Sequence, residues 1–401
     1  MQVSSIMNSS PLRPFSIYVH IPFCRQRCKY CDFNTYATTN LPESEYISAV
    51  LCELDYYGAL PQWQSRPVSS VYFGGGTPSL LRPSSIGKIL EHIHSRFQLQ
   101  DGAEITLEAN PGTTSSDDLS ELHHTGVNRI SIGAQSFDDG MLKTLGRIHT
   151  RDQTYAAVNA AKHAGFTNLS LDLIYGTPSQ TLDQLKYDLE EITKLGTNHI
   201  SVYGLSIEKS TPFYAEYKNG KLKLPEEELL ISMMQEINSF LPSRGYARYE
   251  ISNYSQNGFE AKHNQGYWSG IDYLGLGAGA HGHIMELQGQ KRIAAIRWSN
   301  LVQPAQYIEA ACAKGTAVLS QETLTQEQLK FEFILLGLRR IEGIKIQDFE
   351  DAFELTLGDA YPGILDVLIG ENLLKQEGGY LALSEKGLML ADSVIENFAS
   401  V

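Results

Sequence analysis

Three of the chain's five cysteines lie close together, in the segment HIPFCRQRCKYCDFNTY at residues 20–36. Cys24, Cys28 and Cys31 follow the spacing C-x3-C-x2-C. Thiolates are soft ligands that suit zinc or iron–sulfur clusters. Three of them leave one iron of a 4Fe–4S cluster without a protein ligand, and that iron can bind a small molecule. The triplet therefore favours a 4Fe–4S cluster with one open iron.

A structural zinc site is the alternative interpretation, because His20 would supply a fourth ligand. Two features weigh against it. His20 lies within a predicted strand, and zinc sites more often use paired C-x2-C arms that are far apart in sequence. Cys52 and Cys312 stand alone and are interpreted as ordinary small apolar residues.

A six-fold repeat of strand and helix must position the cysteines. Each predicted strand is rich in β-branched and aromatic residues and is followed by a helix-like stretch, which predicts βαβ units and a parallel sheet. Polar residues and glycines gather at the C-terminal strand ends, the edge at which βα barrels carry out chemistry. We predict an α/β fold with a partial (β/α)6 barrel, and a doubly wound sheet is the alternative. The predicted strands are 15–23, 69–76, 104–110, 129–137, 168–176 and 199–208.

Four segments are expected along the chain. Residues 1–12 are predicted to be a disordered tail, and 13–245 to form the barrel core. Residues 246–300 form an extension rich in aromatic residues, glycine and histidine, and 301–401 a mostly helical, winged-helix-like domain. Residues 320–401 contain 15 acidic and 6 basic residues, so we expect packing or partner docking from this domain rather than DNA binding.

The charge of the whole chain narrows the classes of partner. The formal net charge is −14 and the pI is near 5.3, which disfavours nucleic acids and anionic membrane surfaces. No secretory signal and no apolar run of transmembrane length is visible, so we predict a cytoplasmic protein. In that compartment, clustered cysteines hold metal or carry out chemistry more often than they form disulfides.

The cysteine spacing at the end of the first strand resembles the radical S-adenosylmethionine superfamily, over roughly residues 15–245. The resemblance implies that the amino and carboxylate groups of S-adenosylmethionine chelate the open iron. It further implies that an electron from the cluster breaks the sulfonium C–S bond, giving methionine and a 5′-deoxyadenosyl radical. The cofactor would supply this chemistry while the protein orients it and excludes water.

The other strand ends suit such a ligand. The glycine run at 74–76 has no side-chain bulk, so backbone groups can approach a ligand's ammonium and carboxylate. Glu108, Gln135, Arg147 and Asp172 lie on or after successive strands. Each alone is equally well explained as a structural residue, a buried polar group that satisfies the backbone or a surface arginine. Together at one rim they favour a polar ligand.

Five motifs resemble a narrower family, that of the oxygen-independent coproporphyrinogen III dehydrogenase HemN. They are YVHIPFCRQRCKYCDF, VYFGGGTPSLL, EANPG, GAQSF and LGLGAGAHG. The resemblance implies that Tyr18, Tyr30, Gly75 and Glu108 contact the cluster-bound S-adenosylmethionine. It also implies that residues lining a second S-adenosylmethionine site are retained, namely Gly76, Thr77, Gln135, Arg147 and Asp172.

Two features depart from the dehydrogenase pattern. The triplet begins at residue 24, which leaves little room for an extra segment that would cover the substrate. That pattern continues to a further cysteine two residues after the third, where this chain has Phe33. The variant with phenylalanine resembles the HemW type of heme chaperone in the same family. The segment HNQGYW at 263–268 matches the H-N-x-x-Y-W motif of that type. Histidine is the usual axial ligand of heme iron, and Tyr267 and Trp268 can stack on a flat macrocycle.

A core histidine packed among aromatic residues is the structural alternative for this motif. The predicted heme motif comprises His263, Asn264, Tyr267 and Trp268, and His281 and His283 are alternative iron ligands.

The resemblance leads to two main hypotheses of function. The first is a heme chaperone that binds heme, a 4Fe–4S cluster and S-adenosylmethionine, and delivers heme to acceptor proteins, respiratory and membrane-associated ones among them. It would need a reductant, and a homodimer is left open. The second is oxidative decarboxylation of coproporphyrinogen III to protoporphyrinogen IX. We expect cleavage of S-adenosylmethionine, whereas Phe33 puts coproporphyrinogen oxidase activity in doubt. A third hypothesis is an oxidoreductase-like barrel in which zinc holds the cysteine loop and no radical chemistry takes place.

Overall fold

The computed structural model describes residues 13–399, and the expected tail at 1–12 lies outside them. Six parallel strands in consecutive order form the centre of the large sheet. They are β1 (Phe15–Ile21), β4 (Pro67–Gly75), β5 (Gln98–Ala109), β6 (Arg129–Gln135), β7 (Asn168–Tyr175) and β8 (His199–Gly204). The predicted six-stranded parallel core is confirmed.

The strand order excludes the doubly wound alternative. In a doubly wound sheet the order of the strands reverses at a switch point. Here each of the six core strands lies beside the one that follows it in the core, in the order β1-β4-β5-β6-β7-β8. The barrel stays open because β8 pairs with the antiparallel β10 (Asn253–Ser255) and not with β1. Beyond β10 lies the short β9 (Ala247–Arg248).

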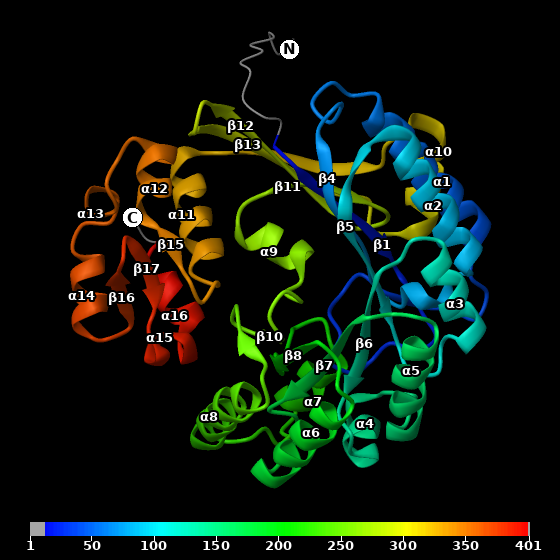
Figure 1. The fold of residues 1–401 in the computed structure, drawn as a ribbon, viewed down its shortest axis with the longest axis horizontal. Helices are drawn as coiled ribbons and strands as arrows, with labels where there is room; N and C mark the ends of the chain where they lie inside the picture. The colour runs from blue at the N-terminus through cyan, green and yellow to red at the C-terminus, as the bar shows by residue number, and fades with distance from the viewer. Residues whose placement is uncertain (1–12, 400–401) are drawn as a thin grey trace.

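Helices cover the outer face of this curved sheet (Figure 1). Their apolar faces meet strands that are buried along almost their whole length, as parallel strands require. Capping boxes begin three of them, at Ser115, Thr150 and Thr181. The helices of the core are α1 (Glu43–Gly58), η1 (Pro78–Leu80), α2 (Pro83–Arg96), α3 (Ser116–His124), α4 (Asp139–Leu145), α5 (Arg151–His163), α6 (Leu182–Lys194), α7 (Pro212–Lys218) and α8 (Glu227–Ser243).

The extension after residue 245 enlarges the same sheet, which the sequence pattern did not indicate. β11 (Asp272–Leu276) lies parallel to β1, and β12 (His281–Gln288), β13 (Lys291–Asn300) and β14 (Val318–Leu324) follow in antiparallel order. β11 reads DYLGL, too short and glycine-rich to stand out as a strand. The short helix α9 (Lys262–Trp268) lies against β4, β1 and β11.

The C-terminal domain has a hydrophobic core of its own, which includes Ile334, Phe349 and Phe398. Its elements are α11 (Gln326–Gly337), β15 (Ile344–Lys345), α12 (Ile346–Phe353), α13 (Leu357–Ala360), α14 (Ile364–Gly370), β16 (Leu374–Glu377), β17 (Tyr380–Leu383), α15 (Glu385–Met389) and α16 (Ala391–Glu396). The three strands form a small antiparallel sheet in the order β15-β17-β16, the wing of the predicted winged helix.

Residues 301–324 lie with the large sheet and not with this domain. α10 (Pro304–Lys314) packs against α1, and β14 pairs with β13. The C-terminal domain therefore begins near residue 325, about one helix and one strand later than predicted. The strand β14 separates α10 from α11 in sequence, but its residues are almost all exposed, so no apolar alternation marks it as a strand.

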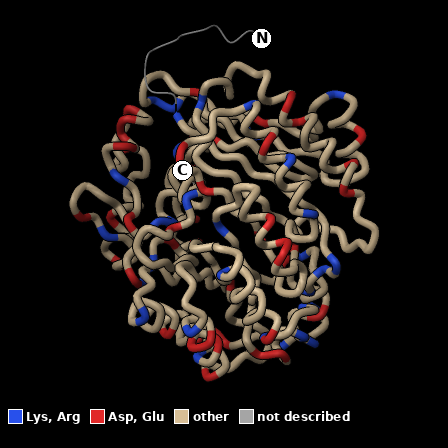
Figure 2. The backbone as a smooth tube through the Cα atoms, turned by 45° about the vertical axis from the view of Figure 1, so that its right-hand side comes forward, with Lys and Arg blue, Asp and Glu red and all other residues tan. Residues whose placement is uncertain are grey.

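Acidic and basic residues are interspersed along the chain (Figure 2). Among residues 13–399, no helix combines the length and the apolarity that crossing a bilayer requires.

Candidate functional site

The loop that carries the three cysteines is fixed against the ends of neighbouring strands. Cys24 ends β2 (Phe23–Cys24), which pairs with β3 (Tyr36–Ala37). The amides of Gly76 and Thr77 donate to the carbonyls of Ile21 and Phe23, at 2.8 Å each. The loop is therefore anchored to the glycine run that follows β4.

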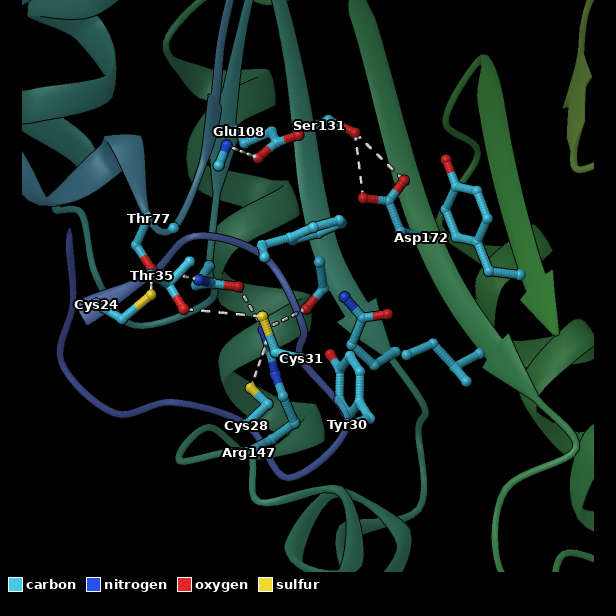
Figure 3. A pocket seen from close by; sticks show the side chains of 18 of the residues that line it. Cys24, Cys28, Tyr30, Cys31, Thr35, Thr77, Glu108, Ser131, Arg147 and Asp172 are labelled. Atoms are coloured by element: carbon cyan, nitrogen blue, oxygen red, sulfur yellow. Dashed lines mark hydrogen bonds between the residues drawn. The ribbon is translucent and has the colours of Figure 1, made fainter. Parts of the chain in front are cut away.

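A polar side chain lies close to each cysteine sulfur (Figure 3). Thr77 Oγ1 is 3.6 Å from Cys24 Sγ, Arg147 Nη1 is 3.6 Å from Cys28 Sγ, and Thr35 Oγ1 is 3.9 Å from Cys31 Sγ. All three cysteines are free thiols. Burial raises the pKa of the Cys24 and Cys31 thiols, so ionising them for metal binding requires the charge of the metal itself.

The donor set fits an iron–sulfur cluster better than a zinc ion. His20, the proposed fourth zinc ligand, uses both ring nitrogens elsewhere, at 3.0 Å from Tyr18 Oη and 2.9 Å from the carbonyl of Asn34. Within residues 13–399, no three His, Cys, Asp or Glu side chains converge on a point that would hold a single metal ion. Three thiols around an open space are the ligand set of a 4Fe–4S cluster with one open iron.

The cysteines line a cavity of about 480 Å³ that opens at the C-terminal ends of the strands. Most of the predicted S-adenosylmethionine residues line the same cavity, and these are Tyr30, Gly75, Gly76, Thr77, Glu108, Gln135, Arg147 and Asp172. Tyr18 does not. Its hydroxyl meets His20, and its ring stacks on Tyr72 with centroids 6.1 Å apart.

The glycine run is required by packing as well as by any ligand. Gly75 has φ +114°, and a Cβ there would lie 2.5 Å from the imidazole of His20. A Cβ on Gly76 would lie 2.6 Å from the carbonyl of Phe23 and 3.0 Å from Cys24 Sγ. A side chain at Gly76 would push the cysteine loop away from β4, and one at Gly75 would displace the His20 ring on β1.

Two partly buried carboxyl groups line the cavity. Glu108 accepts hydrogen bonds from Tyr72 Oη at 2.8 Å and from the amide of Gly75 at 3.1 Å. Burial raises the pKa of Glu108 to about 7. Asp172 accepts from Ser131 Oγ at 3.2 Å, and burial raises the pKa of Asp172 as well. Glu108 is therefore poised to change its charge near neutral pH, and both carboxyl groups can accept hydrogen bonds from a ligand.

Arg147 ties the cysteine loop to the next strands. Its guanidinium reaches Cys28, donates to the carbonyl of Gly133 at 2.9 Å, and donates to Asn110 Oδ1. Asn110 in turn donates to Thr77 Oγ1 at 2.8 Å. Gln135 lies nearby with φ +64°, rare for a residue other than glycine and a mark of local strain at a functional site.

Some residues of this cavity were missed by the sequence reasoning. Asn110 was part of a quoted motif, EANPG, yet was not singled out. Arg129 begins β6 and lines the cavity although it is almost completely buried. The predicted site residues lie toward the C-terminal strand ends, whereas Arg129 is the first residue of β6 and reaches the cavity from the N-terminal end of that strand. Its position at the start of RISIGAQSF gave no signal of this.

The predicted heme motif lies on α9 and is divided between two environments. Asn264 lines the main cavity, and Trp268 lines a second one. His263 is 1% exposed, with Nδ1 2.8 Å from Ser70 Oγ and Nε2 3.1 Å from Tyr267 Oη. Its imidazole stacks on Tyr72, and burial lowers the pKa of His263 to about 3. Both nitrogens thus have protein partners in this conformation.

The two alternative histidines differ from each other. His281 is exposed at the start of β12. His283 is buried, with its ring nitrogens 3.5 Å from Asp272 and 3.6 Å from Glu332. Phe33, the residue that replaces the further cysteine, lies at the main cavity and is 63% exposed.

Two family sequence models match the chain. The one described as the radical SAM superfamily matches residues 18–215, and the one described as the HemN C-terminal domain matches residues 324–390. The first covers the parallel strands and the cysteine loop, and the second covers the domain that begins with α11.

Named relatives are similar over nearly the whole chain. The heme chaperone HemW of Lactococcus lactis is 35% identical, over 96% of this chain and 97% of that protein. HemW of Haemophilus influenzae is 36% identical, over 96% of this chain and 98% of that protein. The solved structure of coproporphyrinogen III oxidase (HemN) from Escherichia coli aligns with a TM-score of 0.82 at 25% identity, over 98% of this chain and 91% of that chain.

Proposed function

Because this chain belongs to the radical SAM superfamily and, within it, to the family of the heme chaperone HemW, we propose that it binds heme and delivers it to acceptor proteins. The observation that carries the proposal is the 33–36% identity to HemW proteins over 96% of the chain. Phe33 supports it from the structure. Among the described residues it is the most exposed large hydrophobic side chain, and it lies at the cavity opening, where a flat apolar ligand or a partner would cover it.

Membership of the superfamily implies a 4Fe–4S cluster and S-adenosylmethionine. Cys24, Cys28 and Cys31 would hold the cluster, and the polar residues of the 480 Å³ cavity would hold S-adenosylmethionine. Together these groups supply one-electron reduction of a sulfonium. The chain's own part is to position and shield them. The Arg147 guanidinium beside Cys28 offsets negative charge at the thiolates, and ionised Glu108 accepts hydrogen bonds from a ligand's ammonium or ribose hydroxyls.

The α9 motif would act in heme binding through residues that face the cavities. Asn264 and Trp268 are available for this, whereas His263 would have to exchange its bonds to Ser70 and Tyr267 before it could bind iron. We therefore propose that His263 positions α9 and that the iron takes its axial ligand elsewhere.

Oxidative decarboxylation of coproporphyrinogen III is the second candidate function. The overall similarity to HemN of Escherichia coli favours it, as does the convergence of Gln135, Arg147 and Asp172 on one cavity. Phe33 counts against it, because the dehydrogenase pattern has a cysteine at that position. We place the heme chaperone first because relatives of that name match at higher identity, 35–36% against 25%, over nearly the whole chain.

We further propose that the protein works in the cytoplasm, takes electrons from a separate reductant, and serves acceptors that include respiratory proteins. A test of the transfer step uses the cluster-reconstituted protein, loaded with heme under anaerobic conditions. It is mixed with a tagged apo-protein that has a vacant b-type heme site, the two are separated, and the absorbance of each fraction is read. Faster filling of the acceptor than by free heme at equal concentration supports the proposal. The proposal is contradicted if heme stays on the chain, or if the acceptor fills no faster than it does with free heme.

A further inference from the structure

A second cavity of about 350 Å³ lies between the extension and the C-terminal domain. Its walls come from separate parts of the chain. They are Arg13 ahead of β1, the end of α9, the β12–β13 hairpin, α11 and the segment that leads through β15 into α12. We call it the basic cleft and define it by Arg13, Trp268, Arg292, Phe333, Arg340 and Lys345. Figure 1 shows α9 between the barrel and the C-terminal domain. The helix borders both cavities, because Asn264 lines the main cavity and Trp268 lines the basic cleft.

The charge of the cleft is opposite to that of its surroundings. Four basic residues line it and one acidic residue, Asp348, does so. Two of the basic residues belong to the C-terminal domain, which has only 6 basic against 15 acidic residues over 320–401. Arg340 is paired with Glu342 at 2.6 Å, and Lys345 with Asp348 at 3.7 Å.

The other two cations have no carboxylate partner among residues 13–399. Arg13 makes a single side-chain hydrogen bond there, a long one of 3.5 Å to the carbonyl of Gly270. The guanidinium of Arg292 lies over the ring of Phe333, 4.6 Å from its centroid. Residues 1–12 contain no Asp or Glu. Burial, followed by the charge of Arg13, lowers the pKa of Arg292 to about 10. The charges of Glu332 and Asp272 act on Arg292 in the opposite sense, but neither carboxylate forms an ion pair with it. Two neighbouring cations without a direct carboxylate partner are costly, and an anion between them would reduce that cost.

The rest of the cleft is apolar and aromatic. Trp268, Phe333 and Leu336 contribute to its walls, and the indole Nε1 of Trp268 is buried without a hydrogen-bond partner. A ligand that suits this cleft therefore combines a flat apolar body with anionic groups at one edge. Planar guanidinium groups favour carboxylates, which they can bind through two parallel hydrogen bonds.

We propose that the basic cleft binds the propionate carboxylates of heme. Arg13 and Arg292 bind the carboxylates, and Trp268 packs against the macrocycle. This inference rests on the proposed function, which supplies heme as the ligand. It assigns the residues that bind the carboxylates, and none of them lies in the cysteine loop or at the C-terminal ends of the six parallel strands. It also explains why Trp268, four residues after Asn264, faces away from the main cavity.

The test compares heme with its dimethyl ester, in which both propionates lack their charge. Each is titrated anaerobically into the cluster-reconstituted wild-type protein and followed by absorbance. We expect esterification to weaken binding at least roughly tenfold, the order of magnitude of one lost charge-assisted hydrogen bond. Arg292→Gln and Arg13→Gln should weaken heme binding by a similar factor and should lose most of the difference between heme and ester.

Arg244→Gln is the matched control, because Arg244 also stacks on a phenylalanine, 5.0 Å from the Phe240 centroid, but lies outside both cavities. It should leave both titrations unchanged. Equal wild-type affinity for heme and ester would overturn the basic cleft as the propionate site and leave the heme chaperone standing. Absence of heme binding by the wild-type protein would overturn both. The ester comparison needs no substitution, so a misfolded variant does not leave the proposal untested.

Discussion

The hydroxyl of Ser70 on β4 and the Nδ1 atom of His263 on α9 lie 2.8 Å apart in the interior of the fold. Tyr267 Oη lies 3.1 Å from the other ring nitrogen, Nε2. The carboxylate of Glu104 accepts hydrogen bonds from the amides of Lys262 and His263. These contacts hold α9 against the parallel sheet. They place Asn264 at the main cavity and Trp268 at the basic cleft.

The first prediction concerns His263. Replacing it with alanine removes the hydrogen bonds of the imidazole to Ser70 and Tyr267, although Ser70 keeps its bond to Ser16. His263→Ala should therefore lower the free energy of unfolding by about 1–3 kcal/mol. Any heme that the variant still binds should keep the wild-type absorbance and electron paramagnetic resonance spectra, because the iron ligand is unchanged. Ser70→Ala, which keeps the imidazole, is the control and should cost about 1 kcal/mol. A changed iron spectrum in His263→Ala alone would identify His263 as the axial ligand.

The second prediction concerns the cysteine triplet. Serine is a poor ligand for iron, so Cys24→Ser, Cys28→Ser and Cys31→Ser should each lose most of the iron and sulfide bound after anaerobic reconstitution. Iron analysis and visible absorbance measure this loss. Cys312→Ser is the matched control, because Cys312 is exposed on α10 and does not line the main cavity, and it should reconstitute like the wild type. Full iron content in all three loop variants would refute the assignment of these ligands.

The third prediction is a pH dependence of S-adenosylmethionine binding. Burial raises the pKa of Glu108 to about 7, so this carboxyl is mostly protonated at pH 6 and mostly ionised at pH 8. The ionised form attracts the ligand's cationic groups, and the affinity should therefore rise about tenfold from pH 6 to pH 8. Calorimetric titration of the reconstituted protein at several pH values measures it. Glu108→Gln should bind more weakly and with a flatter profile, and an unaltered pH profile in that variant would rule Glu108 out as the titrating group.

The fourth prediction concerns the joint between the core and the extension. Glu53 on α1 is buried and accepts hydrogen bonds from Tyr307 at 2.6 Å, the amide of Gly277 at 2.9 Å and Asn300 at 2.8 Å. Burial raises the pKa of Glu53 from 4.5 to about 7. A raised pKa means that the folded state binds the proton more tightly than the unfolded state. The resulting stability is complete below pH 4.5 and is lost as the pH rises through 7.

Glu53→Gln cannot titrate, so the stability difference between the wild type and this variant should shift by about 2–3 kcal/mol in favour of the variant between pH 5 and pH 8. Urea unfolding at both pH values measures the difference. A gap that stays constant with pH would show that Glu53 does not ionise in this range.

The core of the fold could be predicted from the sequence because its signals are local. Nearly unbroken apolar runs such as ISIGA in β6 and amphipathic stretches such as that of α6 give alternating strands and helices. Gly75, Glu108 and Asp172 could be found because parallel strands bring their C-terminal ends to one edge.

The remaining features depend on contacts between distant segments. β11 lies beside β1 although more than 250 residues separate Phe15 from Asp272, and a short DYLGL run gives no hint of this pairing. The burial of His263 depends on Ser70, 193 residues away. Arg13 and Arg292 meet in the basic cleft although nothing in their local sequence marks either one. Such relationships come from packing in three dimensions, which neither periodicity nor motif spacing encodes.

The central claim is that this chain carries heme and does not oxidise porphyrinogen. The most direct test is an anaerobic absorbance titration of the cluster-reconstituted protein with heme, run in parallel with an assay of coproporphyrinogen III, S-adenosylmethionine and a reductant. The account predicts stoichiometric heme binding and no formation of protoporphyrinogen. Protoporphyrinogen formation without heme binding would contradict it, and would show that the chain is a dehydrogenase that works with Phe33 in place of the further cysteine.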